Sequence, residues 1–299
     1  MYAQFFGNFL LSHEVITKEQ LLKAMEQKAA HRPNLGTLAI HAGYMSASEV
    51  DHIHILQTHQ DLKFGELAIQ TGILTQEQVN ELLSMQAPDY LALGEALVNS
   101  GIIDNYELER LIVEYASENE IYDLDSSEDS RFKVEQLFKH YLKTSKKEYV
   151  NEYELLYNTL LFNNLVRFIG DDFTPILGSQ CLEYPKSFCV SQEIRGKFHI
   201  KLYIDMPETA CMAFASRYTG DTFDDFDEYV AASLEDFVNL HNGLFCVNVS
   251  NDHNIELELL PPKIETSPLF EFKNEAFLMP VIYPFGTINF IFELDCNEK

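Results

Sequence analysis

Residues 35–57 read LGTLAIHAGYMSASEVDHIHILQ, and residues 64–86 repeat their pattern as FGELAIQTGILTQEQVNELLSMQ. Related segments begin at Phe6 and at Leu93, so the pattern occurs four times in the first part of the chain. In each copy a glycine follows the first residue, and each of these glycines lies 29 residues after the previous one: Gly7, Gly36, Gly65 and Gly94. A fixed period of this length indicates a duplicated supersecondary unit.

The inner pattern of each copy predicts two short helices. A second glycine breaks the chain in three copies, at Gly43, Gly72 and Gly101, and Glu14 takes its place in the first. The residue pairs that follow have the spacing of a helix-capping box: Thr17 with Gln20, Ser46 with Glu49, Thr75 with Gln78, and Asp104 with Glu107. Apolar residues then recur at helical spacing. Each unit is therefore predicted to be two helices joined at the break and stacked on its neighbours.

The repeat resembles the N-terminal domain of type II secretion and type IV pilus ATPases, the GspE/MshE N-terminal (MshEN) family. That family repeats a motif of the form RLGxxLxxxGxIxxxxLxxxLxxQ, and the stretch from Gly36 to Gln86 carries two copies. Many of its members bind cyclic di-GMP through such tandem motifs. The resemblance therefore implies a cyclic di-GMP site here, centred on these residues: Leu35, Gly36, Lys63, Phe64 and Gly65.

The chain departs from this motif at the arginine before each lead dipeptide. Those positions hold Phe5, Asn34, Lys63 and Ala92, of which only the lysine is cationic. A dianionic dinucleotide needs cations or helix N-termini to offset desolvation of its phosphates. Two interpretations stay open: these residues bind cyclic di-GMP, or they only pack helix against helix.

Composition narrows the classes of partner. The 299 residues contain 21 Lys and Arg against 47 Asp and Glu, a net charge of −26, which argues against binding nucleic acid or an anionic membrane surface. No apolar stretch approaches the ~18 residues of a membrane helix. Five cysteines form no CxxC pair and predict no disulfide framework, so a cytoplasmic protein is expected. Three histidines of the repeat region are expected to be solvated rather than to bind metal: His52, His54 and His59.

The chain is predicted to divide into a helical repeat domain at 1–121, an acidic linker at 122–135 and a second domain at 136–296. In the second domain a helix covers 152–171, two strands flank a turn at Arg195–Gly196, and helices begin near 207 and 229. The second of these is expected to end near Asn242. Strands and helices mixed in this way predict an α+β domain on a largely antiparallel sheet, so the fold class of the whole chain is α+β.

A short polar motif lies on the last predicted helix. Asp236 and Asn239 are three residues apart and so share one helix face. Gly243 follows four residues after Asn239, and 22 residues separate Asn239 from Pro262. This pattern resembles the CheC/CheX family of chemotaxis phosphatases, over roughly residues 149–294. Because the motif occurs once, the domain is CheX-like rather than CheC-like.

The resemblance implies hydrolysis of the aspartyl phosphate of a response-regulator receiver such as CheY. Asn239 would orient the attacking water and Asp236 would pair with the active-site lysine of the receiver. The receiver supplies Mg²⁺, so no cofactor of this chain's own is implied. The family has Glu where this chain has Asp236, and the side chain is shorter by one methylene, about 1.5 Å of reach.

That difference leaves two functions open. One is a phosphatase whose repeat domain serves as a docking or nucleotide-sensing module. The other is a non-enzymatic signalling adaptor that binds a receiver through its second domain and a secretion, pilus or motility component through its repeats. CheX relatives often form homodimers, although no residue of this sequence requires one.

Overall fold

The computed structural model describes residues 3–28, 33–85, 89–120, 152–176 and 178–295. The chain divides into two units, one spanning Tyr2–Ser126 and the other containing Ser127–Lys299. The described part of the first unit is helical, and that of the second combines helices with a sheet, which confirms the predicted α+β class. The predicted acidic linker at 122–135 lies outside the described residues.

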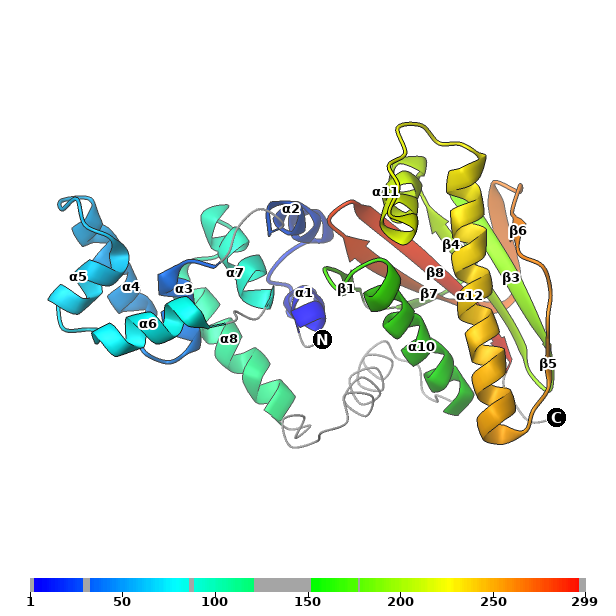
Figure 1. Cartoon of the computed structure of the whole chain (residues 1–299), viewed down its shortest axis with the longest axis horizontal. Coiled ribbons are helices and arrows are strands. Elements are labelled where there is room, and N and C mark those ends of the chain that lie inside the picture. Colours follow the sequence, from blue (N-terminus) through cyan, green and yellow to red (C-terminus); the bar gives the residue numbers. More distant parts are fainter. Residues whose placement is uncertain (1–2, 29–32, 86–88, 121–151, 177, 296–299) are drawn as a thin grey trace. The chain divides into compact units, whose positions relative to one another are not determined.

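The described residues of the first unit form four helix pairs, as the 29-residue period predicts (Figure 1). The pairs are α1 (Ala3–Ser12) with α2 (Lys18–Lys28), α3 (Leu35–His41) with α4 (Ala47–Gln57), α5 (Phe64–Gln70) with α6 (Gln76–Ser84), and α7 (Asp89–Asn99) with α8 (Asn105–Glu120). The capping boxes are confirmed at α2, α4 and α6, where cap and third residue exchange side-chain-to-backbone hydrogen bonds. Asp104 likewise caps α8 by accepting from the Glu107 amide at 2.8 Å.

The break between paired helices needs a left-handed backbone. Gly43, Gly72 and Gly101 have φ values of 69°, 75° and 67°, and Glu14 adopts the same conformation at 57°. The first copy therefore keeps the geometry of the others without the glycine that would adopt it without strain.

Three of the lead glycines, Gly36, Gly65 and Gly94, lie where the two helices of a pair pack closely. A Cβ atom on Gly36 would lie 2.9 Å from Val50 Cγ1, and one on Gly94 would lie 2.5 Å from Leu108 Cδ1. Gly65 faces Val79 in the same way, at 3.3 Å. In these three units the facing residue comes 14 positions after the glycine, so the repeated glycine reflects a repeated helix contact.

The order of the units in space differs from their order in the chain. The second unit packs on the third, as expected of chain neighbours, whereas α1 and α2 of the first unit pack on α7 of the fourth. The fourth unit also contacts the second through α4 and α8. Units that pack together are therefore not always consecutive in the chain.

The contact between α4 and α8 is reciprocal. The Ala47 amide donates to Glu109 Oε2 at 2.8 Å, and Asn105 Nδ2 donates to Asp51 Oδ1 at 2.7 Å. Residues 47 and 105 are equivalent in the repeat, as are 51 and 109, because each pair differs by 58 positions, or two periods. The second and fourth units are thus related by a local pseudo-twofold axis.

The second unit is built on one sheet in which every strand pairing is antiparallel, as predicted. The strand order is β1-β7-β8-β4-β3-β5, with β2 on β7 and β6 on β3. The strands are β1 (Thr174–Pro175), β2 (Ser179–Pro185), β3 (Phe188–Gly196), β4 (His199–Met206), β5 (Leu257–Leu259), β6 (Lys263–Ile264), β7 (Leu269–Tyr283) and β8 (Gly286–Asp295). Three strands that were not predicted, β1, β2 and β6, are very short or polar.

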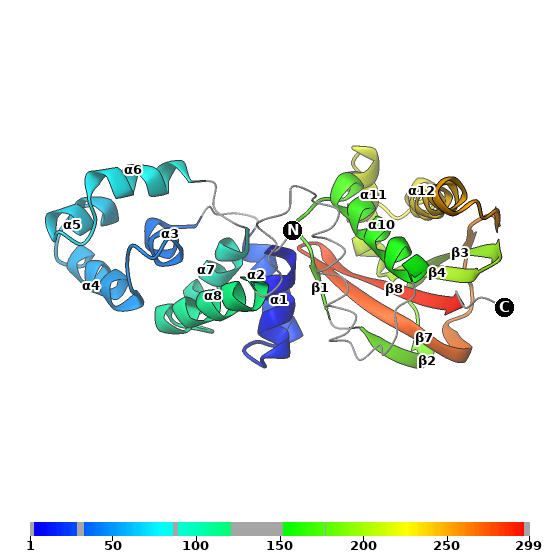
Figure 2. The same ribbon diagram turned by 90° about the horizontal axis from the view of Figure 1, so that it is seen from below.

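Of the helices in the described part of this unit, three cover one face of the sheet (Figure 2): α10 (Glu152–Phe168), α11 (Glu208–Thr219) and α12 (Glu228–His253). The predicted end of α12 near Asn242 is wrong, because Gly243 does not break the helix. Instead it ends at His253, where Asn254 takes a left-handed conformation at φ 55°. In α10 two polar residues, Asn158 and Asn164, are buried among the apolar ones.

Candidate functional site

Asp236 and Asn239 lie on the outer face of α12. Both are exposed, whereas Phe237 and Val238 between them are fully buried against the rest of the domain. The buried pair fixes how the helix is rotated about its axis, and the two polar side chains therefore point to solvent together. The helix-face relation predicted from their spacing is present in the structure.

The side chain of Asn239 is held although it is exposed. Gln192, on β3 beneath the helix, donates from Nε2 to Asn239 Oδ1 at 2.9 Å. The same nitrogen donates to the carbonyl oxygen of Leu260 at 2.8 Å. Leu260 lies two residues before Pro262, so this contact brings the proline segment of the motif next to the helix segment.

Gln192 is itself fixed from below. Its Oε1 accepts from Asn242 Nδ2 at 2.9 Å, and Asn242 Oδ1 accepts from the phenol of Tyr157 on α10. Gln192 is 1% exposed, and Asn242 and Tyr157 are fully buried. A chain of hydrogen-bonded polar groups thus runs through the core from α10 to the exposed Asn239.

Asp236 is also engaged. Tyr218 on α11 donates its phenolic hydrogen to Asp236 Oδ2 at 2.6 Å. Burial, reinforced by this carboxylate, raises the pKa of Tyr218, so the phenol remains a donor. Glu235, next along the helix, is half-buried and does not share the outward position of Asp236.

Neither Gln192 nor Tyr218 was predicted as part of the site. One signal for Gln192 was present in the sequence, because it occupies a strand position between Val190 and Ile194 on the face that packs against the helices. A polar residue at an apolar position usually has a specific partner. Tyr218 carries no such signal.

Gly243, the glycine of the motif, is not required by close packing. A Cβ on Gly243 would lie 4.0 Å from Leu259 Cδ2, so the position has room for a side chain.

The loop at 221–227 ends at Asp227, whose Oδ1 caps α12 by accepting from the Tyr229 and Val230 amides at 3.0 Å. The loop's other acidic residues are exposed, so the approach to α12 is negatively charged.

A second unpredicted feature is a histidine buried under α12. His241 is fully buried, its Nδ1 lies 3.2 Å from Asn164 Nδ2, and its ring packs edge-on against Tyr157. Nε2 has no hydrogen-bond partner within the described part of the chain. Burial lowers the pKa of His241 to about 3 from the ordinary 6.5, so this ring is neutral at physiological pH.

Because His241 is buried in its neutral form, we expect the free energy of unfolding to decrease in acid. Above pH 6.5 the neutral His241 leaves the free energy of unfolding unchanged. As the pH falls from 6.5 toward 3 the free energy of unfolding decreases, because the unfolded chain then binds a proton that the folded chain excludes. Each pH unit in that window should cost about 1.4 kcal/mol. His241→Gln, which retains an acceptor for Asn164 but cannot ionise, is expected to flatten the dependence of unfolding free energy on pH between 6.5 and 5.

Urea denaturation at a series of pH values measures this slope. His59→Gln, which removes an exposed histidine of the repeat unit, is the control substitution. Equal slopes for His241→Gln and the wild type would show that the buried ring does not set the acid sensitivity.

The residues predicted for cyclic di-GMP come together in the structure. A Cβ on Gly65 would lie 3.1 Å from Leu35 Cδ2, and one on Gly36 would lie 3.3 Å from Phe64 Cζ. The lead dipeptides of the second and third units thus pack against one another. Lys63 is exposed at the start of α5, where its amide donates to Glu66 Oε2 at 2.9 Å. The contacts of the four other residues are those of helix packing.

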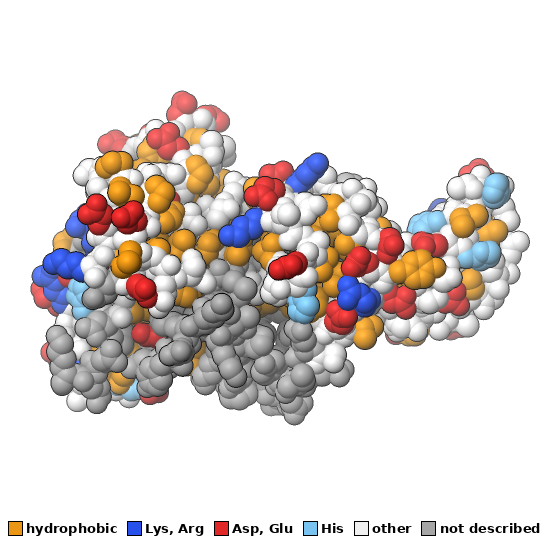
Figure 3. Space-filling view, turned by 180° about the vertical axis from the view of Figure 1, so that it is seen from behind, with side chains coloured by type: hydrophobic (Ala, Val, Ile, Leu, Met, Phe, Trp, Pro, Cys, Tyr) orange, Lys and Arg blue, Asp and Glu red, His pale blue; other side chains and the backbone are white. Residues whose placement is uncertain are grey.

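His52, His54 and His59 are exposed, and histidine side chains are visible on the surface in Figure 3. Within the described ranges no group of three or more His, Cys, Asp or Glu residues is arranged to hold a metal ion. The four described cysteines are free thiols. Among the described helices, none combines the length and apolar character that a membrane span needs.

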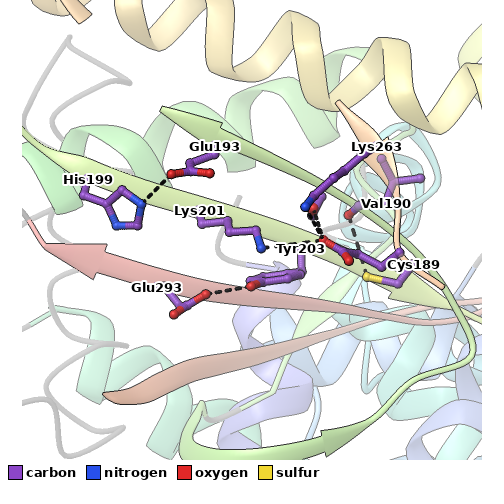
Figure 4. A network of polar contacts seen from close by, with 10 residues as sticks. Cys189, Val190, Glu193, His199, Lys201, Tyr203, Lys263 and Glu293 are labelled. Atoms are coloured by element: carbon purple, nitrogen blue, oxygen red, sulfur yellow. Dashed lines mark hydrogen bonds and ion pairs between the residues drawn. The ribbon is translucent and has the colours of Figure 1, made fainter. Parts of the chain in front are cut away.

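A separate polar network lies on the sheet face opposite the helices (Figure 4). His199 Nε2 lies 2.9 Å from Glu193 Oε1, and the Tyr203 hydroxyl donates to Glu293 Oε1 at 2.6 Å. Lys201 Nζ lies 4.4 Å from the centre of the Tyr203 ring. These contacts link β3, β4 and β8, and they account for the polar side chains of that face as cross-strand pairs.

No protein-family model and no curated protein matches the chain. Solved structures of chemotaxis proteins resemble about half of it. A CheX protein from Desulfovibrio desulfuricans is 14% identical over 48% of this chain and 100% of its own, with a TM-score of 0.42. A CheC-like superfamily protein from Shewanella sp. PV-4 is 16% identical over 49% and 99%, with a TM-score of 0.43.

A third structure is the CheX–CheY–BeF3–Mg complex from Borrelia burgdorferi. Its matching chain is 19% identical over 48% of this chain and 98% of its own, with a TM-score of 0.39. A likeness at these identities and TM-scores assigns no activity and no site residue to this chain.

Proposed function

We propose that the second unit acts on phosphorylated response-regulator receivers and accelerates hydrolysis of their aspartyl phosphate. The observation that supports this function best is the position of Asn239, an exposed amide whose orientation is fixed by a hydrogen bond from the buried Gln192. Asp236 lies beside it on the same outward face of α12. The motif that these residues form with Pro262 is the pattern of the CheX family.

The chemistry suits an amide. Hydrolysis of an acyl phosphate needs a water molecule in line with the bond that breaks, and most of the catalysis is positioning and charge stabilisation. Asn239 can bind and orient this water without changing its protonation state. The receiver contributes the phosphoryl group, the Mg²⁺ ion and a lysine, and Asp236 is the carboxylate placed to meet that lysine.

The negative charge near α12 also favours docking of a receiver. The exposed acids of the loop at 221–227 lie directly before α12. Acidic side chains near a docking face attract a partner whose active site carries a lysine and a divalent cation, mainly by raising the association rate at low salt.

The test is the lifetime of phosphate on a panel of purified CheY-like receivers, phosphorylated with acetyl phosphate in the presence of Mg²⁺. Addition of the full-length protein is expected to shorten the lifetime for at least one receiver. Unchanged lifetimes across the panel would reject phosphatase activity.

The hydrogen bond from Tyr218 to Asp236 favours a second function, that of a non-enzymatic adaptor. A carboxylate that is already engaged, on a side chain shorter than the family's glutamate, is less able to reach a lysine of the receiver. In this case the protein binds the phosphorylated receiver through α12 and a secretion, pilus or motility component through the repeats. A complex that forms only with the phosphorylated or BeF3-treated receiver, with no change in phosphate lifetime, would identify the adaptor.

For the repeat unit, binding of cyclic di-GMP remains a proposal supported by the motif and by the exposed Lys63. One cation is a weak match for two phosphates, and Leu35, Gly36, Phe64 and Gly65 are occupied by helix contacts. Calorimetric titration of the full-length protein is expected to show at most weak binding, reduced further by Lys63→Ala. Tight binding that Lys63→Ala leaves unchanged would place the ligand elsewhere.

A further inference from the structure

Three polar side chains that are hydrogen-bonded to one another lie buried in the core beneath α12. Tyr157 and Asn242 are fully buried and Gln192 is 1% exposed. Buried polar groups cost free energy unless each is hydrogen-bonded, and a connected chain of them constrains every member. This chain ends at Asn239, the exposed residue that carries the proposed chemistry.

One backbone atom determines how the amides are oriented. The carbonyl oxygen of Leu260 has no hydrogen to donate, so the end of Gln192 that faces it must be the NH₂ group. The same nitrogen lies 2.9 Å from the Asn239 side chain, whose inward end must therefore be the oxygen. On the other side, Gln192 Oε1 accepts from Asn242 and Asn242 Oδ1 accepts from Tyr157. The direction of each hydrogen bond follows from the first.

The outward end of Asn239 is thereby defined. With Oδ1 turned toward Gln192, the Nδ2 hydrogens face away from the sheet, and Nδ2 has no partner within the described ranges. One lone pair of Oδ1 also remains. A water molecule at this position can accept from Nδ2–H and donate to Oδ1, which fixes its orientation.

We infer that Gln192 is a positioning residue that holds the Asn239 amide with its nitrogen outward, ready to orient the attacking water. The inference rests on the proposed function. Without this anchor the exposed amide rotates freely and must be ordered during each encounter, which costs rate but not docking. Loss of one such hydrogen bond is expected to lower kcat by about tenfold and to leave KM unchanged.

Two substitutions of Gln192 test this, with a matched control on the same strand. Gln192→Met keeps the volume and removes the donor, so kcat for receiver dephosphorylation should fall about tenfold. Ser191→Ala is the control. Ser191 is equally buried but faces the opposite side of β3, where it donates to Glu265 Oε1 at 2.6 Å, so its loss weakens the strand without affecting Asn239.

Gln192→Glu adds a readout that a merely structural role would not change. A protonated glutamic acid can still donate to Asn239, whereas the carboxylate can only accept and should turn Nδ2 inward. Burial raises the pKa of such a carboxyl group. The kcat of Gln192→Glu should therefore fall as pH rises through neutrality, relative to the wild type at each pH.

The outcomes separate this inference from the proposed function. Wild-type kcat in both Gln192 variants, or an equal loss in Ser191→Ala, would overturn the positioning role. If the wild type accelerates no receiver, NMR of the free protein still decides. Scalar coupling across the hydrogen bonds should connect Gln192 Nε2 with the Leu260 carbonyl carbon and with Asn239 Cγ, and its absence at Asn239 would reject the inference independently of activity.

Discussion

Replacement of Asn239 by alanine is expected to lengthen the lifetime of receiver phosphate by about 100-fold relative to the wild-type protein. Removal of one preorganised group that acts on the reacting atoms commonly costs 10²–10³ in rate. The fold should be unaffected, because the Asn239 side chain is exposed and Gln192 keeps its hydrogen bond to Leu260. The measurement is the decay of phosphorylated receiver with catalytic amounts of each protein, together with the melting temperature.

Two further variants test whether the loss of rate is specific to the Asp236 and Asn239 positions. Ser250→Ala removes another exposed polar side chain of α12 and should retain the wild-type rate. Asp236→Glu lengthens the side chain by one methylene and is expected to increase the rate, since under the proposed function the carboxylate then reaches further toward a lysine of the receiver. An Asn239→Ala protein as active as the wild type would exclude the proposed role, and a coincident loss of melting temperature would point to a fold defect.

Replacement of Gly94 by valine is expected to destabilise the repeat unit by about 3 kcal/mol. Even a Cβ would lie 2.5 Å from Leu108 Cδ1, and Leu108 is fully buried, so its side chain is surrounded by other packed groups. Added volume in a close-packed contact typically costs 1–3 kcal/mol, and the branched side chain extends the overlap beyond Cβ. Urea denaturation followed by circular dichroism measures the change.

A double-mutant cycle tests the cause of this loss. Leu108→Ala alone should destabilise by about 2–5 kcal/mol through the cavity it leaves. Combined with Gly94→Val, it makes room for the new side chain, so the double variant should be more stable than the sum of the two losses predicts. Gly243→Ala is the matched control, because that mid-helix glycine has space for a Cβ and should lose no stability. Strict additivity of the two losses would reject the packing explanation.

Much of the local structure followed from near neighbours in the sequence. The four helix pairs, their capping boxes and the breaks at Gly43, Gly72 and Gly101 depend on residues a few positions apart. The hairpin around Gly196 depends on period-two alternation in the same way. The end of α12 was misplaced, because Gly243 weakens a helix without stopping it. The helix ends instead at His253, where Asn254 takes a left-handed conformation.

The order of the repeats required the folded structure. All four units share the same local pattern, so their sequences do not distinguish one stacking order from another. The choice is made by contacts between distant residues, such as the reciprocal pairs of Ala47 with Glu109 and Asp51 with Asn105. Those pairs place the second unit against the fourth across a local twofold axis.

At the candidate site, too, one part of the geometry follows from the sequence and the other part from the tertiary structure. The sequence alone determined that Asp236 and Asn239 share a helix face, because a three-residue separation on a helix has only one geometry. Only the tertiary structure decided which end of the Asn239 amide faces solvent and that Tyr218 holds Asp236. Gln192 is 47 residues from Asn239 and Tyr218 is 18 from Asp236 in the chain, and such pairs meet only when the sheet and its helices pack.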